Sequence, residues 1–122
     1  MSLKFEKEIE DVRGVTLSLT KGDQKIFVVE TKKGFSRGGH YHNITMKHLL
    51  VSGKIEHKKT DIKSGRETIN IIDSPSTVIT PPNTAHLLTA LEDSITVETF
   101  VEHPQSTLFP KYREIVDKKM KS

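Results

Sequence analysis

The sequence contains no cysteine. A chain without cysteine cannot form a disulfide framework or a thiolate metal site, and it has no thiol nucleophile. It also lacks any apolar run near the roughly 20 residues of a membrane span. Its first residues, MSLKFEKEIED, are charged throughout and lack the apolar centre of a signal peptide. These absences predict a cytoplasmic protein that does not cross a membrane.

An excess of charge of one sign is also missing. The formal net charge is only +3, and Lys118, Lys119 and Lys121 at the C-terminus contribute much of the excess. No continuous basic stripe runs through the rest of the sequence, and basic residues do not alternate with aromatic ones as they do in nucleic-acid readers. The composition therefore predicts a solvated surface of mixed charge and no nucleic-acid partner.

Short β-rich runs carry most of the apolar residues. They recur between turn signals about every 8 to 12 residues, which is typical of an all-β sandwich or barrel. The 122 residues predict one domain, residues 1–122. The isoleucines within residues 69–72 are predicted to lie in the core. Only residues 112–120 have helical spacing, which predicts a short C-terminal helix. Strands are expected over residues 15–19, 26–29, 40–42, 46–51, 54–61, 67–72, 77–80, 85–90 and 94–101, with an edge strand or a loop over 4–10.

Four histidines form the strongest functional signal. His40 and His42 are separated by one residue, so both imidazoles point to the same face of a strand. His48 follows six residues later, and His86 comes just after a rigid turn at Pro81 and Pro82. Imidazoles gathered in this way suit a metal site or general acid–base catalysis. Both uses remain open at this point.

The two histidine segments resemble the two motifs of the cupin superfamily. The first motif is a glycine-led His-x-His, followed by glutamate and then glycine, and it matches Gly39, His40, His42 and Gly53. The second is a proline-led turn that ends in histidine, and it matches residues 81–86. The resemblance covers about residues 11–101, with its motif core at 37–101. It implies a double-stranded β-helix, which is a jelly-roll barrel.

The resemblance also implies a set of metal ligands, namely His40, His42 and His86. The glutamate of the family motif falls at Met46 or Lys47, and neither side chain is a carboxylate. His48 lies on the same strand face as Met46 and is a candidate fourth ligand. Four imidazoles would bind zinc, nickel or copper, with zinc or nickel expected first. A site that works without metal is the alternative.

A narrower resemblance concerns the segment RGGHYHN, the later VSGK and the opening D-V-R-G at residues 11–14. These are similar to cupins of sugar-nucleotide and surface-polysaccharide biosynthesis, a group that includes 3,4-ketoisomerases, 3,5-epimerase-like proteins and the C-terminal cupin domain of capsular-polysaccharide reductases. This similarity implies an isomerase or epimerase acting on a nucleotide-linked sugar, with His40 or His42 as the catalytic base. The alternative is a cupin that binds a metal or small ligand without chemistry of its own.

Other residues have simpler expected roles. Arg37 precedes two glycines at the expected barrel rim, where it either binds a phosphate or carboxylate of the substrate or is solvated. Tyr41 alternates away from the histidines and is expected to serve in packing, and Lys47 is expected on the surface. His57 and His103 are expected to be structural, and His57 is expected to lie outside the pocket.

We also expect a homodimer, because small cupins bury apolar strand faces beyond those that one barrel covers. Phe5, Leu108, Phe109 and Tyr112 are the candidates for its interface. The alternative is that these residues fold back onto their own barrel.

Overall fold

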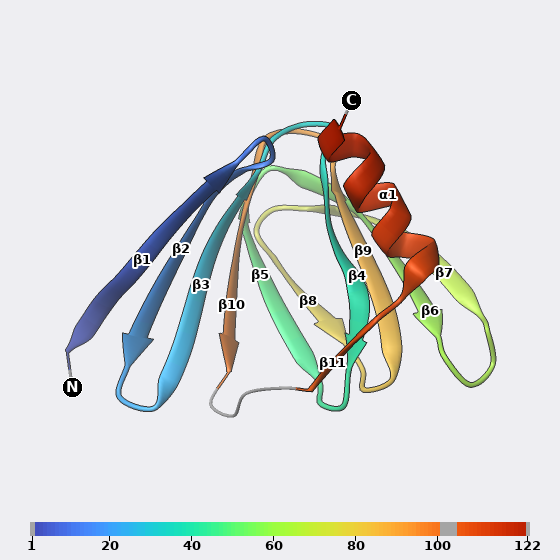
Figure 1. Ribbon diagram of the computed structural model, residues 1–122, viewed down its shortest axis with the longest axis horizontal. Helices are drawn as coiled ribbons and strands as arrows, with labels where there is room; N and C mark the ends of the chain where they lie inside the picture. The colour runs from blue at the N-terminus through green and yellow to red at the C-terminus, as the bar shows by residue number, and fades with distance from the viewer. Residues whose placement is uncertain (1, 101–104, 122) are drawn as a thin grey trace.

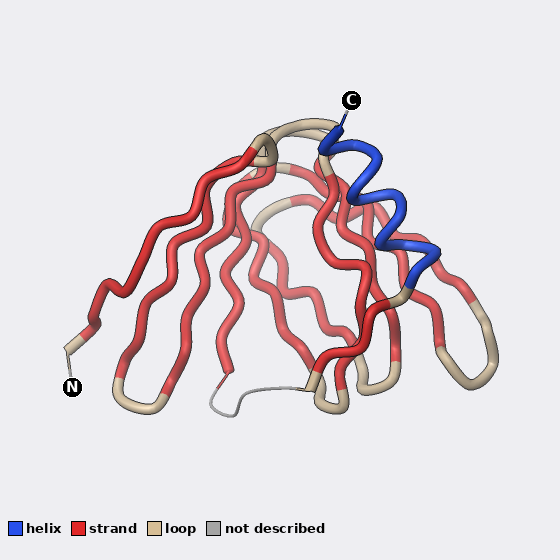
Figure 2. The backbone as a smooth tube through the Cα atoms, viewed as in Figure 1, coloured by secondary structure: helices blue, strands red, loops and turns tan. Residues whose placement is uncertain are grey.

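Two antiparallel sheets face each other in the computed structural model, which describes residues 2–100 and 105–121 (Figure 1). The six-stranded sheet has the order β1-β2-β3-β10-β5-β8, and the five-stranded sheet has the order β11-β4-β9-β6-β7. Figure 2 shows that strands make up most of the described chain and that the helix lies at the C-terminal end. The predicted all-β jelly-roll with one short C-terminal helix is therefore confirmed.

The bounds of the strands follow the turn signals closely. In the six-stranded sheet the strands are β1 (Leu3–Asp11), β2 (Gly14–Lys21), β3 (Gln24–Thr31), β10 (Ser94–Phe100), β5 (Met46–Ser52) and β8 (Ser76–Thr80). In the five-stranded sheet they are β11 (Ser106–Leu108), β4 (Ser36–His42), β9 (Thr84–Ala90), β6 (Lys54–Asp61) and β7 (Glu67–Asp73). The stretch over 4–10 is thus part of an edge strand, and β11 is a strand that the sequence pattern did not predict.

The single helix, α1 (Pro110–Lys121), lies over the outer face of β4 and β9 (Figure 1). It begins at a proline, whose fixed φ suits the first turn of a helix. Tyr112 and Val116 are one helical turn apart and are both fully buried, and they pack with Ala85 and Leu87 of β9. This apolar cluster attaches the helix to the sheet.

A second apolar cluster lies between the two sheets. It consists of Leu50, Ile55, Val78 and Leu88, with Ile72 packed against it. The prediction that all the isoleucines of residues 69–72 lie in the core is wrong. Ile69 and Ile71 are 53% and 54% exposed, because β7 is an edge strand and these two side chains alternate with Ile72 onto its uncovered face.

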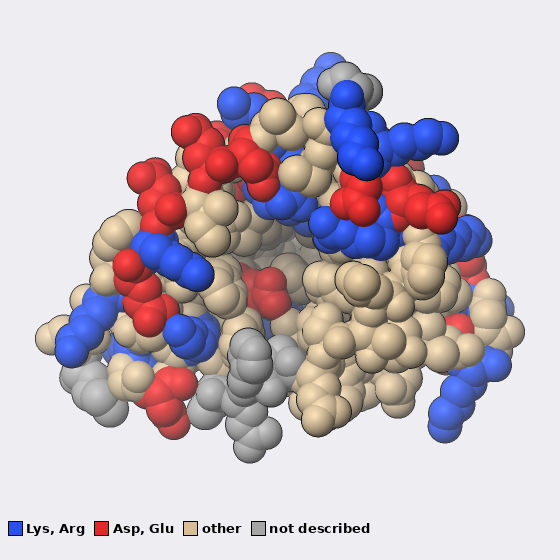
Figure 3. Space-filling view, in the orientation of Figure 1, with Lys and Arg blue, Asp and Glu red and all other residues tan. Residues whose placement is uncertain are grey.

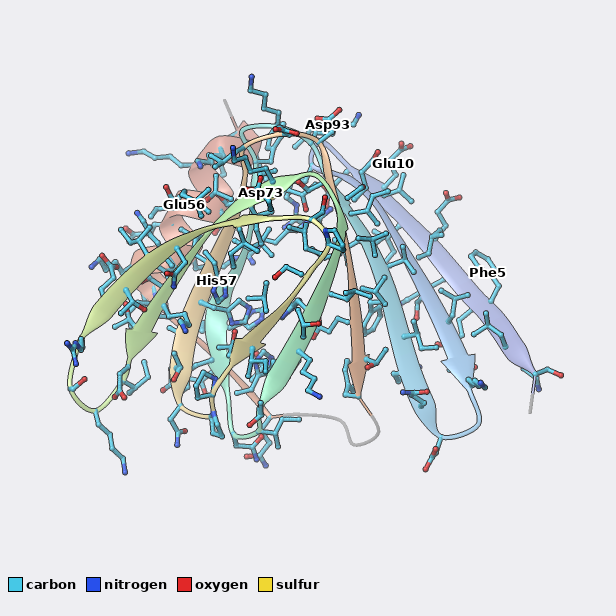
Figure 4. All side chains as sticks on the ribbon, turned by 180° about the vertical axis from the view of Figure 1, so that it is seen from behind. Phe5, Glu10, Glu56, His57, Asp73 and Asp93 are labelled. Carbon is cyan, nitrogen blue, oxygen red and sulfur yellow. The ribbon has the colours of Figure 1, made fainter. Side chains whose placement is uncertain are left out.

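The residues expected at a dimer interface divide into two groups. Phe5 and Leu108 are exposed on the edge strands β1 and β11, and Figure 4 shows Phe5 far from the space between the sheets. Tyr112 is buried and Phe109 packs against it, with ring centroids 4.9 Å apart. The assignment of Tyr112 to an interface is therefore wrong, because it is fully buried against its own barrel, while the partly buried Phe109 stays a candidate. The homodimer itself stays a prediction.

Candidate metal and ligand site

Three strands bring four histidines together between the sheets. His40 and His42 come from β4, His86 comes from β9 directly opposite His40, and His48 comes from β5. The ring centroids are 4.7 Å apart for His40 and His42, 5.1 Å for His40 and His86, and 5.5 Å for His48 and His86. All four predicted site histidines thus converge, because the period of two keeps them on the inward faces of their strands.

A fifth histidine, His57 of β6, also lies inside the barrel. Figure 4 labels His57. It is only 2% exposed, and its ring centroid is 6.2 Å from that of His86. Its Nε2 lies 3.4 Å from the hydroxyl of Thr80. The pairing of β6 with β9 thus turns His57 inward beside the cluster, but His57 lines a cavity with residues of β7 and β8 and neither of the cavities that the other four histidines line. His103 lies outside the described residues.

Two adjacent glycines on β4 permit close packing on both sides of the strand. Gly38 has a φ of +104°, and a Cβ there would lie 2.6 Å from the carbonyl oxygen of His86. Gly39 has a φ of +85°, and a Cβ there would lie 2.8 Å from the Cα of Arg113 in α1. Both distances are too short for a real side chain. The glycine pair therefore lets β4 approach His86 on one side and the helix on the other.

Two cavities meet at the histidines. The larger has a volume of about 700 Å³ and is lined by His40, His42 and Glu98 together with residues of β1, β2 and β3. The smaller has a volume of about 140 Å³ and lies deeper, beside His40, His48, His86 and Glu98. In Figure 3 the molecule is hollowed near its centre, between the two sheets. The larger cavity is thus the route by which a small molecule would reach the imidazoles.

Glu98 is a site residue that the sequence reasoning missed. It lies on β10, opposite His48 of β5, and its Oε2 is 3.3 Å from Nε2 of His48. The signal in the sequence was a single acidic residue in an otherwise uncharged strand, SITVETF. Alternation from the buried Thr96 places Glu98 on the inward face. It was overlooked because the family motif places its glutamate elsewhere.

The electrostatics of the interior favour neutral imidazoles. Burial lowers the pKa of His40 to about 4, with the neighbouring His42 as the next cause. Burial also lowers the pKa of His42 and holds the pKa of His86 well below its usual range. For Glu98, burial raises the pKa, but the hydrogen bond with His48 and the nearby imidazoles outweigh it, so the net pKa is lowered. At neutral pH the imidazoles of His40, His42 and His86 are thus neutral, and Glu98 beside them is a carboxylate.

The donor atoms fit a divalent transition metal. Nδ1 of His42 and Nδ1 of His86 are buried and have no hydrogen-bond partner within the described residues. Such orphaned nitrogens are costly unless a ligand satisfies them, and neutral imidazole is the form that binds metal. Within residues 2–100 and 105–121, no three histidine or acidic side chains surround one point closely enough to hold an ion as they stand. Their side chains would have to rotate to close around one.

The remaining predicted residues are placed as follows. Tyr41 packs toward the α1 cluster and Lys47 is exposed, as expected. Arg37 is half-buried and makes hydrogen bonds within the protein. It donates from Nη2 to the carbonyl of Glu30 at 2.6 Å and from Nε to the hydroxyl of Thr31 at 3.2 Å. Burial, and then the neighbouring Arg13, lowers the pKa of Arg37 to about 10. Its side chain lines the smaller cavity.

The two facing antiparallel sheets and the pocket between them give this chain the fold of the cupins. Among solved structures it is similar to CapF, the capsular polysaccharide assembling protein of Staphylococcus aureus, at 20% identity and a TM-score of 0.75, over 84% of this chain and 31% of that chain. It is also similar to Bacillus subtilis oxalate decarboxylase, which has Mn(II) centres, at 16% identity and a TM-score of 0.72, over 88% of this chain and 31% of that chain.

Identities this low establish the shared fold alone. The chain spans 31% of the length of each of these two structures. No protein-family model and no curated protein matches the sequence. In the part of the chain that the structure describes, no helix is long and apolar enough to cross a membrane.

Proposed function

We propose that this protein is a cupin that binds a divalent metal ion through histidines of β4 and β9 and presents it to a small molecule in the larger cavity. The observation that carries the proposal is the convergence of His40, His42 and His86, together with the unpaired buried Nδ1 atoms of His42 and His86. Three neutral imidazoles from two rigid strands are a suitable set of nitrogen ligands for zinc, nickel, iron or copper. A bound ion would polarise a carbonyl or hydroxyl oxygen of the ligand.

Elemental analysis of the purified protein tests this proposal directly. We expect close to one equivalent of a divalent transition metal per chain, either as isolated or after loading with zinc or nickel. His42→Ala should lose most of the metal. Lys47→Ala is the matched control, because Lys47 is exposed beside His48 and should leave the metal content unchanged. Equal metal content in wild type and His42→Ala would overturn the proposal.

A second candidate function is the isomerisation or epimerisation of a nucleotide-linked sugar. The residues that line the larger cavity favour it. Phe27 and Phe100 lie in its wall with ring centroids 5.6 Å apart, which suits stacking with a planar base. Lys25 lies in the same wall, paired with Glu6 at 2.8 Å, and its ammonium group could bind a diphosphate. The likeness in fold to the capsular polysaccharide assembling protein CapF adds a second reason to test this substrate class.

The predicted catalytic bases bear on the choice between these two functions. A general base works best with a pKa near the operating pH, whereas the pKa of His40 is lowered to about 4. A neutral imidazole with so low a pKa is a weak base but remains able to bind a metal. The lowered pKa of His40 therefore favours metal binding over base catalysis. For the second candidate function, His40 and His42 remain the proposed catalytic bases.

Titration with UDP-linked and dTDP-linked hexoses, followed by calorimetry, would test the second candidate. We expect micromolar to millimolar binding that Phe27→Ala weakens, while Phe5→Ala on the exposed edge strand leaves it unchanged. Arg37 is our candidate for contact with an anionic group of the ligand, so Arg37→Gln should weaken sugar-nucleotide binding but not metal uptake. Absence of binding to every nucleotide sugar tested would remove this candidate and leave the metal-binding proposal intact.

A further inference from the structure

Glu98 occupies the position in the interior where a carboxylate has the most effect on the histidines. It lies on the inward face of β10, opposite His48 of β5 and Phe27 of β3. Glu98 and His40 line both cavities. Its side chain is 22% exposed, so it lies mostly out of water. A carboxylate in such a place needs strong partners to remain charged.

The partners that the protein itself supplies are few. Within the described residues, His48 is the one basic side chain within ion-pairing distance of Glu98, at 3.3 Å. One imidazole N–H can satisfy only one of the roughly four lone-pair positions of a carboxylate. Glu98 also lines the smaller cavity, together with His40 and His86. A cation there would complete the coordination of the carboxylate.

The place of Glu98 also relates to the residue that the cupin motif lacks. Of the two positions where the motif glutamate falls, Lys47 is exposed, whereas Met46 is buried on β5 and lies two residues from His48 on the same face. Glu98 faces His48 from the adjacent strand β10. A carboxylate that is missing from β5 is thus available from the next strand of the sheet, beside the same histidine.

We propose that Glu98 is the carboxylate ligand of a mixed site in which His40, His42 and His86 supply the nitrogens and His48 positions Glu98. This inference rests on the proposed metal-binding function and deepens it. It assigns His48 to the carboxylate rather than to the metal, because Nε2 of His48 is directed at Glu98. It also widens the range of metals, since carboxylate oxygen suits manganese and imidazole alone favours zinc, nickel and copper.

The test compares Glu98→Gln with wild type in calorimetric titrations with Mn²⁺ and with Zn²⁺. Glutamine keeps the shape of the side chain and removes its charge. We expect Mn²⁺ affinity to fall by about 100-fold and Zn²⁺ affinity by less, about tenfold, since losing interactions at a metal site costs factors of this order. Glu8→Gln, on the exposed face of β1, is the matched control and should change neither affinity.

A double variant that moves the carboxylate from β10 to β5 tests whether Glu98 acts as a metal ligand. Its Mn²⁺ affinity should not recover if Glu98 has only a structural role. Met46→Glu combined with Glu98→Gln restores a carboxylate at the motif position and should recover most of the Mn²⁺ affinity. Circular dichroism without metal establishes that each variant is folded. If the double variant does not fold, the Mn²⁺ affinity of Glu98→Gln compared with that of Glu8→Gln still tests whether Glu98 is a ligand.

The outcomes separate this inference from the proposed function. Wild-type Mn²⁺ affinity in Glu98→Gln, with metal binding lost in His42→Ala, would overturn the role of Glu98 and leave the histidine site standing. Loss of Mn²⁺ affinity in Glu98→Gln with recovery in the double variant would establish it. A wild-type protein that takes up neither metal would overturn the proposed function, and the role of Glu98 with it.

Discussion

Strand β9 has one face between the sheets and one face under α1, and the two faces bury different kinds of side chain. Under the helix, Ala85 and Leu87 pack with Tyr112 and Val116 in an apolar cluster. Between the sheets, His86 lies among four other imidazoles and has an unpaired buried nitrogen. Apolar groups need no partner, whereas buried nitrogens do.

This difference indicates which face of β9 makes stability depend on pH and on added metal. The helix-covered face should contribute stability that depends little on pH or on added metal. The inner face should respond to protons and to metal ions, because its groups gain or lose partners with each. Perturbations of the two faces should therefore give different signatures, which the following measurements compare in order of expected effect.

The largest effect is expected from Leu87→Ala under the helix. Leu87 is 2% exposed, and truncating a buried leucine leaves a cavity that costs about 2–5 kcal/mol of unfolding free energy. Urea denaturation measures this loss. Leu49→Ala is the control, since Leu49 is 43% exposed on the outer face of β5 and should cost far less. Equal losses for the two variants would contradict the burial of Leu87 in the apolar cluster under the helix.

Acidification should come next, through His57 on the inner side. Burial, followed by the nearby His48 and Lys59, lowers the pKa of His57 from 6.5 to about 4. The unfolded chain therefore takes up a proton first, and stability should be full above about pH 6.5 and fall as the pH drops toward 4. The expected loss is about 3 kcal/mol for this one residue. Denaturation at a series of pH values measures it, and His57→Gln should flatten the slope in this window.

Added metal should raise stability by a similar amount. An ion that binds only the folded chain contributes about 2.7 kcal/mol at a hundred times its dissociation constant, because the unfolded chain has no formed site. Zinc or nickel should therefore raise the melting temperature by several degrees, and the rise should weaken as the pH falls toward about 4, where the His40 imidazole, whose pKa burial lowers to about 4, takes up a proton. His42→Ala should remove most of the rise and Lys47→Ala should keep it. The same rise in both variants would place the metal elsewhere.

A smaller effect is expected at the polar edge of the helix cluster. The hydroxyl of Tyr112 lies 2.6 Å from that of Thr60 and donates to Oε2 of Glu67 at 2.7 Å. Tyr112→Phe removes these hydrogen bonds and keeps the ring, so it should cost about 1–2 kcal/mol. Chemical denaturation with and without zinc checks this value. A changed metal response in Tyr112→Phe would show that the two faces of β9 are coupled.

The smallest effect on folding is expected for Phe5→Ser on β1, because Phe5 is 62% exposed. A surface substitution of this kind changes the unfolding free energy by about 0.5 kcal/mol or less. If the predicted homodimer forms through this strand, light scattering should give a dimer for wild type at micromolar concentration and a larger monomer fraction for Phe5→Ser. A wild-type monomer would reject the dimer.

Residue patterns within single strands predicted much of this molecule. The alternation of His40 and His42, and the rigid turn before His86, placed three of the histidines on inward faces because the period of two is a local property. The same reasoning could not settle outcomes that depend on which strands become neighbours. His57 is inside because β6 pairs with β9, and Ile69 and Ile71 are outside because β7 has an uncovered face.

Glu98 illustrates the same limit at the site itself. Its distance in sequence from the histidines is large, and only the pairing of β10 with β5 brings it to His48. Such non-local pairing is fixed by the whole sheet and not by any one segment. Arg37 is a separate case, because Thr31 and Glu30 are only six and seven residues away in the sequence, and its hydrogen bonds to them depend on how the turn between β3 and β4 is formed.

The glycine pair on β4 has a consequence for how this chain can change over time. Gly38 lies against the backbone of His86, and Gly39 lies against the backbone of Arg113 in α1. In a saturation library of β4 these two positions should tolerate the fewest replacements. Gly38 variants should be lost first under selection for metal uptake, because they push His86 away. Gly39 variants should be lost under selection for folded protein alone, because they lift the helix. Substitutions at two neighbouring positions would thus separate the requirement for metal uptake from the requirement for folding.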